Sequence, residues 1–135
     1  MDIRFRAWYE KDNEVHEVDK IDFKNGEIYF DNGQIAFFNE VKLLKYTGLK
    51  DRKGQCIYEG DIIHWETDIN NKYLGDFKIE ADAIVEWSQE ELKWVLREKE
   101  QMYFDELKDL ASYDFEVIGN IYENPELLKE GQVSK

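Results

Sequence analysis

Short segments in which apolar and polar residues alternate, separated by glycines and Asx residues, restrict this chain to a fold made mostly of strands. Residues 3–9 (IRFRAWY) place apolar side chains on one face of an extended strand and two arginines on the other, which is typical of a strand with one buried face. In residues 27–38, Asp31, Asn32 and Gly33 separate two apolar segments and tolerate positive φ, which predicts a tight hairpin. The pattern of residues 14–23 is mixed, and further strands are expected at 41–48, 82–87, 92–96 and 114–122.

The stretch YTGLKDRKGQCIYEGDII, residues 46–63, places glycines six residues apart. Gly48 follows a predicted strand, and Gly54 ends a polar turn that predicts a second hairpin, with residues 55–58 as the returning strand. Gly60 then predicts a corner before the next strand. A phosphate-binding loop is the alternative, but the stretch lacks the GxxxxGK[ST] pattern and a helix directly behind it. We therefore predict structural turns at Gly33, Gly48, Gly54, Gly60 and Asp61.

Helices are expected only in the C-terminal third. Apolar residues recur at helical spacing over 101–110, at Met102, Tyr103, Phe104, Leu107 and Leu110. Asn124 as N-cap and Pro125 in the first turn predict a short helix within 123–130. Residues 67–80 are polar and rich in asparagine, which predicts a long hairpin loop.

These patterns together predict a mainly β (β-rich α+β) fold. Antiparallel hairpins would form a small, at least partly closed SH3-like barrel, with one or two short helices near the C-terminus. A length of 135 residues fits one domain, 1–135, because a chain of this size can bury a single large core.

The one cysteine, Cys56, excludes an intramolecular disulfide and a multi-cysteine zinc site, and it fits a reducing cytoplasm. The segment MDIRFRAWYE carries charges throughout and lacks the apolar run of a signal peptide. No stretch approaches the length of a membrane-spanning helix. We therefore expect a cytoplasmic protein that does not insert into membranes.

The formal net charge is −13, and residues 98–130 hold ten carboxylates against three lysines. A field this negative repels phosphate backbones, so direct nucleic-acid binding is not expected. The acidic segment is either a solvated face that maintains solubility or a surface that attracts a basic partner. The sequence leaves both interpretations open.

Three groups of residues could carry chemistry, and each has a structural explanation. Cys56 could pair with His16 or His64 as a nucleophile, but it alternates within a strand where a small buried side chain is usual. A second group, on one strand face, could bind a divalent metal: His64, Glu66 and Asp68. A third could act as an acid–base pair or cap turns: Asp51, Glu59 and Asp61. We predict no catalytic residues, no metal and no cofactor.

Aromatic residues give the stronger binding signal, with four tryptophans, eight tyrosines and eight phenylalanines. Tryptophan and tyrosine are enriched where binding energy concentrates. Trp65, Trp87 and Trp94 are the candidates for an interface, although aromatic residues also fill the cores of sheets. An exposed sheet edge would offer a second route to a partner or to a homo-oligomer.

Three sequence blocks resemble the signature blocks of the YopX family, which is found in phages and prophages. They are IRFRAWY, YTGLKDRKGQCIYEGDII and FEVIGNIYENPELL, in that order, and the resemblance spans about residues 3–128. It implies a small, β-rich, phage-encoded cytosolic protein and implies no mechanism. The chain departs from the usual family pattern mainly in its acidic, polar middle loop, residues 67–80, to which the resemblance assigns no role.

Two classes of function fit these observations. The first is a non-catalytic accessory protein that binds a host or phage protein. The second is an acidic mimic of DNA that occupies a nucleic-acid-binding protein, which would need carboxylates in rows with the spacing of duplex phosphates. An enzyme of unknown type is a distant third.

Overall fold

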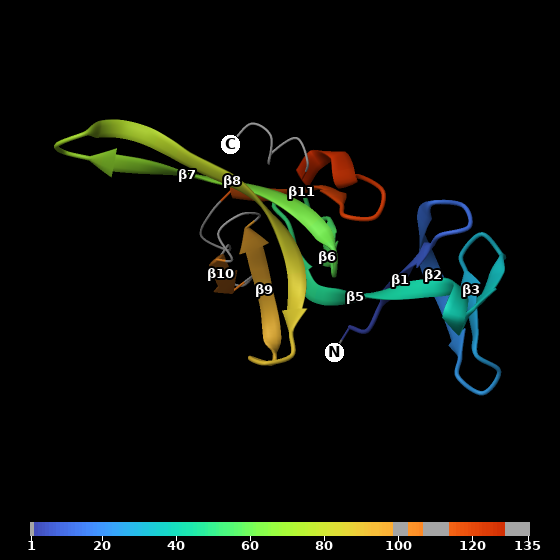
Figure 1. Cartoon of the computed structure of the whole chain (residues 1–135). Helices are drawn as coiled ribbons and strands as arrows, with labels where there is room; N and C mark the ends of the chain where they lie inside the picture. Colours follow the sequence, from blue (N-terminus) through green and yellow to red (C-terminus); the bar gives the residue numbers. More distant parts are fainter. Residues whose placement is uncertain (1, 99–102, 107–113, 129–135) are drawn as a thin grey trace.

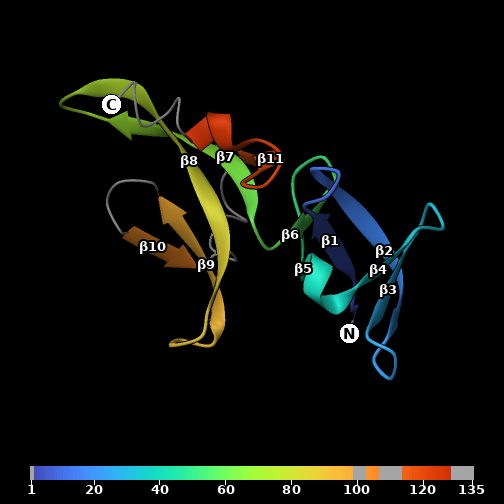
Figure 2. The ribbon, with the colours of Figure 1, turned by 45° about the vertical axis from the view of Figure 1, so that its right-hand side comes forward.

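The computed structural model describes residues 2–98, 103–106 and 114–128, which form two antiparallel sheets lying side by side (Figures 1 and 2). The first sheet has the order β4-β3-β2-β1-β5-β6, and the second has the order β10-β9-β8-β7-β11. The strands of the first sheet are β1 (Phe5–Tyr9), β2 (Glu14–Asp22), β3 (Glu27–Phe30), β4 (Ile35–Phe37), β5 (Val41–Lys50) and β6 (Cys56–Tyr58). Those of the second are β7 (Asp61–Asn71), β8 (Gly75–Ser88), β9 (Lys93–Glu98), β10 (Tyr103–Glu106) and β11 (Asp114–Asn120).

The mainly β prediction is confirmed, and helix is limited to a 3-10 turn at Phe38–Glu40 and a helical turn at 125–128 within the described ranges. Neither sheet closes on itself in this part of the chain. The first sheet ends at β4 and β6, and the second ends at β10 and β11. The SH3-like barrel is therefore not confirmed.

Each sheet has its own apolar cluster. The cluster of the first sheet is Ala7, Tyr9, Ile28, Phe30 and Ala36. The cluster of the second sheet is Ile57, Ile63, Ala83, Val85 and Leu96. Ile57 belongs to β6, which pairs with β5 of the first sheet, yet its side chain is fully buried in the second cluster. Strand β6 therefore joins the two sheets.

The chain crosses from the first sheet to the second at Gly60. Its amide donates to the carbonyl of Val85 at 2.8 Å, and its carbonyl accepts from the amide of Ile121 at 2.9 Å. Its φ is +86°, a conformation that side chains other than glycine rarely adopt. Gly33, Gly48 and Gly54, the other three glycines assigned to turns, also have positive φ.

The long loop predicted at 67–80 is wrong. Strand β7 continues to Asn71 and β8 starts at Gly75, so only residues 72–74 form the turn. The side chain of Asn71 accepts hydrogen bonds from the amides of Tyr73 and Leu74 at 2.8 and 2.7 Å. The asparagine and glycine residues therefore mark a tight turn. The alternation of Ile69, Phe77 and Ile79 with polar residues was the strand signal in this segment.

The helix predicted over 101–110 is wrong at 103–106, which form β10 against β9. Its other positions, including Met102, Leu107 and Leu110, lie outside the described residues. Strand β9 offers an unpaired backbone edge, and pairing with that edge outweighs the local helical spacing.

Replacing Gly60 by alanine should destabilise the fold more than the same change at Gly54. An added Cβ at Gly60 would lie 2.8 Å from Cε2 of Tyr122, whereas at Gly54, with φ of +83°, it would meet no atom within 4 Å. Gly54→Ala therefore costs only the left-handed strain of about 1–2 kcal/mol. Gly60→Ala adds overpacking, for a total of about 3 kcal/mol or more in the free energy of unfolding.

Denaturant unfolding of both variants beside the unchanged protein measures this difference. Equal losses at the two sites would contradict the close approach of Tyr122.

Candidate functional site

A polar cavity of about 290 Å³ lies where the two sheets meet. Its lining comes from all three sequence blocks that carry the family resemblance. Arg6 belongs to the first block, Gln55 and Asp61 to the second, and residues 117–120 with Glu123 and Asn124 to the third. Segments far apart in the sequence therefore converge at the junction of the sheets.

Asp61 is the titratable group of this cavity that departs most from ordinary behaviour. Its side chain is buried, and one carboxylate oxygen accepts a hydrogen bond from the amide of Tyr58 at 2.8 Å. Burial raises the pKa of Asp61 to about 7, although that hydrogen bond and the charge of Arg6 both act to lower it. The guanidinium of Arg6 lies 4.1 Å from the centre of the Tyr58 ring and forms an ion pair with Glu17.

The third block contributes a set of side-chain hydrogen bonds around Asn120. The side-chain oxygen of Asn120 accepts from the amides of Tyr122 and Glu123, at 3.0 and 2.8 Å. Asn124 precedes the helical turn at 125–128, and its side-chain oxygen accepts from the amide of Asn120 at 3.1 Å. Pro125 is the first residue of that helical turn. Asn120, which sequence reasoning missed, is thus the centre of this turn.

Asp51 is a second buried carboxylate, and it joins the sheets directly. One oxygen accepts from the amides of Lys53 and Gln55, both at 2.9 Å, and the other accepts from the amide of Val117 on β11 at 3.0 Å. Burial acts to raise the pKa of Asp51, but these three hydrogen bonds outweigh it and the pKa is lowered.

The possible acid–base group of Asp51, Glu59 and Asp61 is thus held largely by backbone contacts. Asp51 and Asp61 each accept amide hydrogen bonds that fix a turn. The amide of Glu59 donates to the carbonyl of Lys45 at 2.9 Å. These contacts are those of structural turns.

Cys56 and the two histidines have separate partners. The sulfur of Cys56 accepts a hydrogen bond from Arg4 at 3.4 Å. His16 contacts Asp12 at 2.7 Å and stacks on Phe30. The ring of His64 lies between two carboxylates of β8. These polar contacts join each histidine to a carboxylate and Cys56 to an arginine, so none of them pairs Cys56 with a histidine.

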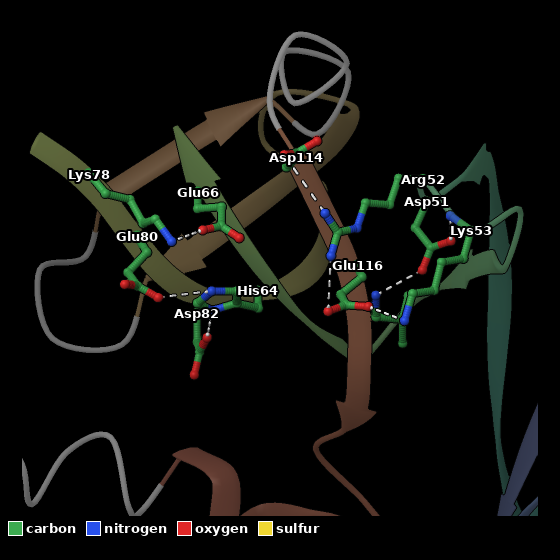
Figure 3. A network of polar contacts seen from close by, with 11 residues as sticks. Asp51, Arg52, Lys53, His64, Glu66, Lys78, Glu80, Asp82, Asp114 and Glu116 are labelled. Carbon is green, nitrogen blue, oxygen red and sulfur yellow. Dashed lines mark hydrogen bonds and ion pairs between the residues drawn. The ribbon is translucent and has the colours of Figure 1, made fainter. Parts of the chain in front are cut away.

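The polar face of β7 and β8 brings together residues that the sequence separates by 18 positions (Figure 3). Nδ1 of His64 lies 2.8 Å from Asp82, and Nε2 lies 3.1 Å from Glu80. Glu66 forms an ion pair with Lys78 at 2.7 Å. The ligand atoms of His64, Glu66 and Glu80 all lie within 4.8 Å of one another.

Glu80, not the predicted Asp68, is therefore the third member of this group. Asp68 lies opposite Lys78 in the register, one step further along the hairpin. Sequence alternation identifies neighbours along one strand, whereas Glu80 arrives from the adjacent strand.

The opposite face of the same hairpin carries apolar side chains. The turn end of this hairpin projects away from the rest of the molecule (Figure 1). We call residues 67–82 the ribbon, because among the described residues β7 beyond position 66 and β8 before position 83 pair only with each other. Ile69, Phe77 and Ile79 share one face of the ribbon, and Tyr73 and Leu74 at its tip are 86% and 77% exposed.

The three tryptophans proposed for an interface differ in exposure. Trp65 and Trp94 are partly buried and pack against the apolar cluster of the second sheet. Trp87 is 42% exposed and lies edge-on to Trp94, its register partner, with ring centres 5.3 Å apart. Trp87 is thus the member of this group that offers surface to a partner.

The two sheets, joined where the three sequence blocks meet, make this a small antiparallel β protein. The family model described as YopX protein matches residues 4–129, so the chain belongs to the YopX family. A search of curated proteins finds no match.

A solved structure extends this likeness. The crystal structure of protein EF1440 from Enterococcus faecalis is similar, with a TM-score of 0.62 and 28% sequence identity, over 95% of this chain and 99% of that chain. Within the described ranges, no helix has the length and apolar character needed to cross a membrane.

Replacing Asp61 by asparagine should change how stability depends on pH. Because the folded pKa of about 7 exceeds the ordinary value of 3.8, folding takes up a proton between these pH values. The contribution of Asp61 is therefore fully present below about pH 4 and is lost as the pH rises to about 7. Across this window, the unfolding free energy of the unchanged protein should fall relative to that of Asp61→Asn by up to about 4 kcal/mol.

Urea unfolding of both proteins at several pH values measures this difference. Since the other titrating groups are common to both proteins, parallel stability curves would contradict the raised pKa of Asp61.

Replacing Asp51 by asparagine should destabilise the protein by about 2–3 kcal/mol at neutral pH, because the amide group turns a donor toward backbone N–H groups. Asp114→Asn is the matched control, since that carboxylate is exposed and its ion pair with Arg52 is long, at 3.7 Å. Thermal and denaturant unfolding should separate the two variants clearly. Similar stabilities would show that Asp51 does not hold the junction.

Proposed function

We propose that this protein is a non-catalytic accessory protein of a phage or prophage, which acts in the bacterial cytoplasm by binding a host or phage protein. The observation that supports this most is the ribbon, whose apolar face and tip are exposed. Membership of the YopX family supports a phage or prophage setting. The buried carboxylates Asp51 and Asp61 have structural roles, which favours binding over catalysis.

The ribbon offers a partner two kinds of contact. Tyr73 and Leu74 at the tip, with Phe77 and Ile79 behind them, supply apolar area of the kind that concentrates binding energy. Both backbone edges of the ribbon face away from other described strands, so a partner strand can add to either edge. A protein with an apolar pocket or an open sheet edge fits these features.

The alternative, an acidic mimic of DNA, draws support from the net charge of −13. A mimic needs rows of unpaired carboxylates, whereas several on the described surface contact cations. Glu116 contacts Lys53 and Arg52, and Glu66 contacts Lys78. This pairing favours the protein-binding module.

The test compares two variants of the full chain in affinity capture from phage-infected cells, followed by mass spectrometry. Tyr73→Ser with Leu74→Ser removes the apolar tip of the ribbon. Phe23→Ser removes an aromatic side chain that is similarly exposed, at 79%, in the turn between β2 and β3. We expect a protein that co-purifies with the unchanged chain and with Phe23→Ser to be lost with the tip variant.

Purified partner then separates the two hypotheses. Apolar contact predicts binding that changes little with salt and is unaffected by duplex DNA. Salt-sensitive binding that duplex DNA displaces would instead support the mimic. Equal capture of a partner by all variants would exclude the ribbon tip as the contact. Sedimentation of the purified protein alone tests whether the ribbon instead binds another copy of this chain.

A further inference from the structure

The polar face of three adjacent strands carries two rows of charged side chains in register. In the first row, His64 of β7 lies between Glu116 of β11 and Asp82 of β8. In the second row, Glu66 lies between Asp114 and Glu80 in the same way. The register therefore brings five carboxylates and one imidazole together on one face.

The second row places acidic residues directly opposite one another, an arrangement that destabilises a sheet unless a cation lies nearby. In the described part of the chain, the cations that contact this face are Arg52 and Lys53 on the β11 side and Lys78 on the β8 side (Figure 3). Among the described residues, five carboxylates thus face three cationic side chains. A divalent metal ion would offset this excess of two negative charges.

The histidine of this face is oriented as metal-binding histidines are. Asp82 lies 2.8 Å from Nδ1 of His64, so it can hold a proton on that nitrogen. The other nitrogen, Nε2, lies 3.1 Å from Glu80 and is the ring atom left to bind an ion, which would take the place of any proton shared with that carboxylate. A carboxylate behind a histidine fixes the ring and increases the electron donation of the ligating nitrogen.

We propose that His64, Glu66 and Glu80 form a binding site for a divalent transition-metal ion such as Zn²⁺, with Asp82 as the positioning residue for His64. One imidazole nitrogen and two carboxylates are ligands that Zn²⁺ and its neighbours accept. Their ligand atoms lie within 4.8 Å of one another, so small side-chain movements suffice to surround an ion. Three protein ligands leave a coordination position for water or a partner group.

Lys78 competes with the metal in this site. Its ammonium group lies 2.7 Å from Glu66 and must move aside for that carboxylate to bind an ion. The lysine is half exposed, so water can accept it at little cost. This proposal is independent of the protein contact proposed above, because the apolar residues of the ribbon occupy the opposite face.

The test uses the full chain, freed of metal with a chelator and titrated with Zn²⁺ by calorimetry at physiological salt with excess Mg²⁺. We expect one Zn²⁺ per chain. His64→Ala and Glu80→Gln should each weaken binding about tenfold or more, and Asp82→Asn about 10–100-fold. Lys78→Met should bind Zn²⁺ more tightly.

Asp68→Asn is the matched control, because it removes one negative charge, as Glu80→Gln does. Asp68 follows Glu66 on the same face of β7 but is not among the three proposed ligands. It should leave Zn²⁺ binding nearly unchanged. In histidine ring NMR spectra, Zn²⁺ should shift the signals of His64 and leave those of His16 in place. The melting temperature of each variant in the presence of chelator shows whether that variant is folded. If His64→Ala does not fold, Glu80→Gln still tests the site, because the side chain of Glu80 is exposed.

Two results would overturn the site. One is an Asp68→Asn variant that loses as much Zn²⁺ affinity as Glu80→Gln. Such a loss would show that Zn²⁺ is attracted by the overall negative charge and is not bound by specific ligands. The other is Zn²⁺ binding that leaves the His64 ring signals unmoved.

Discussion

The arrangement of both sheets depends on one buried carboxylate, that of Asp51, which follows β5. It fixes the turn before β6 through the amides of Lys53 and Gln55, and it holds β11 through the amide of Val117. Because the turn and β11 are tied to one side chain, β6 is placed where Ile57 enters the core of the second sheet. The buried charge is tolerated because three N–H groups compensate its lost hydration.

The three family blocks are explained largely by this junction. Arg6, Asp61 and Asn120 come from different blocks and line the same cavity, and their described contacts connect strands and turns of the protein itself. The residues that carry the family resemblance therefore mainly hold the fold together. The features that we assign to binding lie mainly between the second and third blocks, on β7 and β8. This separates the part of the chain that builds the fold from the part available for function.

The β7–β8 hairpin has two faces of opposite chemistry because alternate residues of a strand point to opposite sides. One side carries Phe77 and Ile79, and the other carries Lys78 and Glu80. At the base of the hairpin the apolar side continues into the core of the second sheet, beside Trp65. Beyond position 66 that core ends, so the same alternation leaves apolar side chains exposed. A partner protein and a metal ion would thus use different faces of one element.

Local alternation, backbone freedom and short motifs were enough to predict the mainly β character, the hairpin turn at Gly33 and the family. The sequence by itself did not determine that 67–80 is paired or that 103–106 is a strand, since strand pairing depends on an edge supplied by another segment. Likewise it identified His64 and Glu66 as neighbours along one strand. Only the register between β7 and β8 brought Glu80 and Asp82 to them, because contacts across strands are set by tertiary pairing.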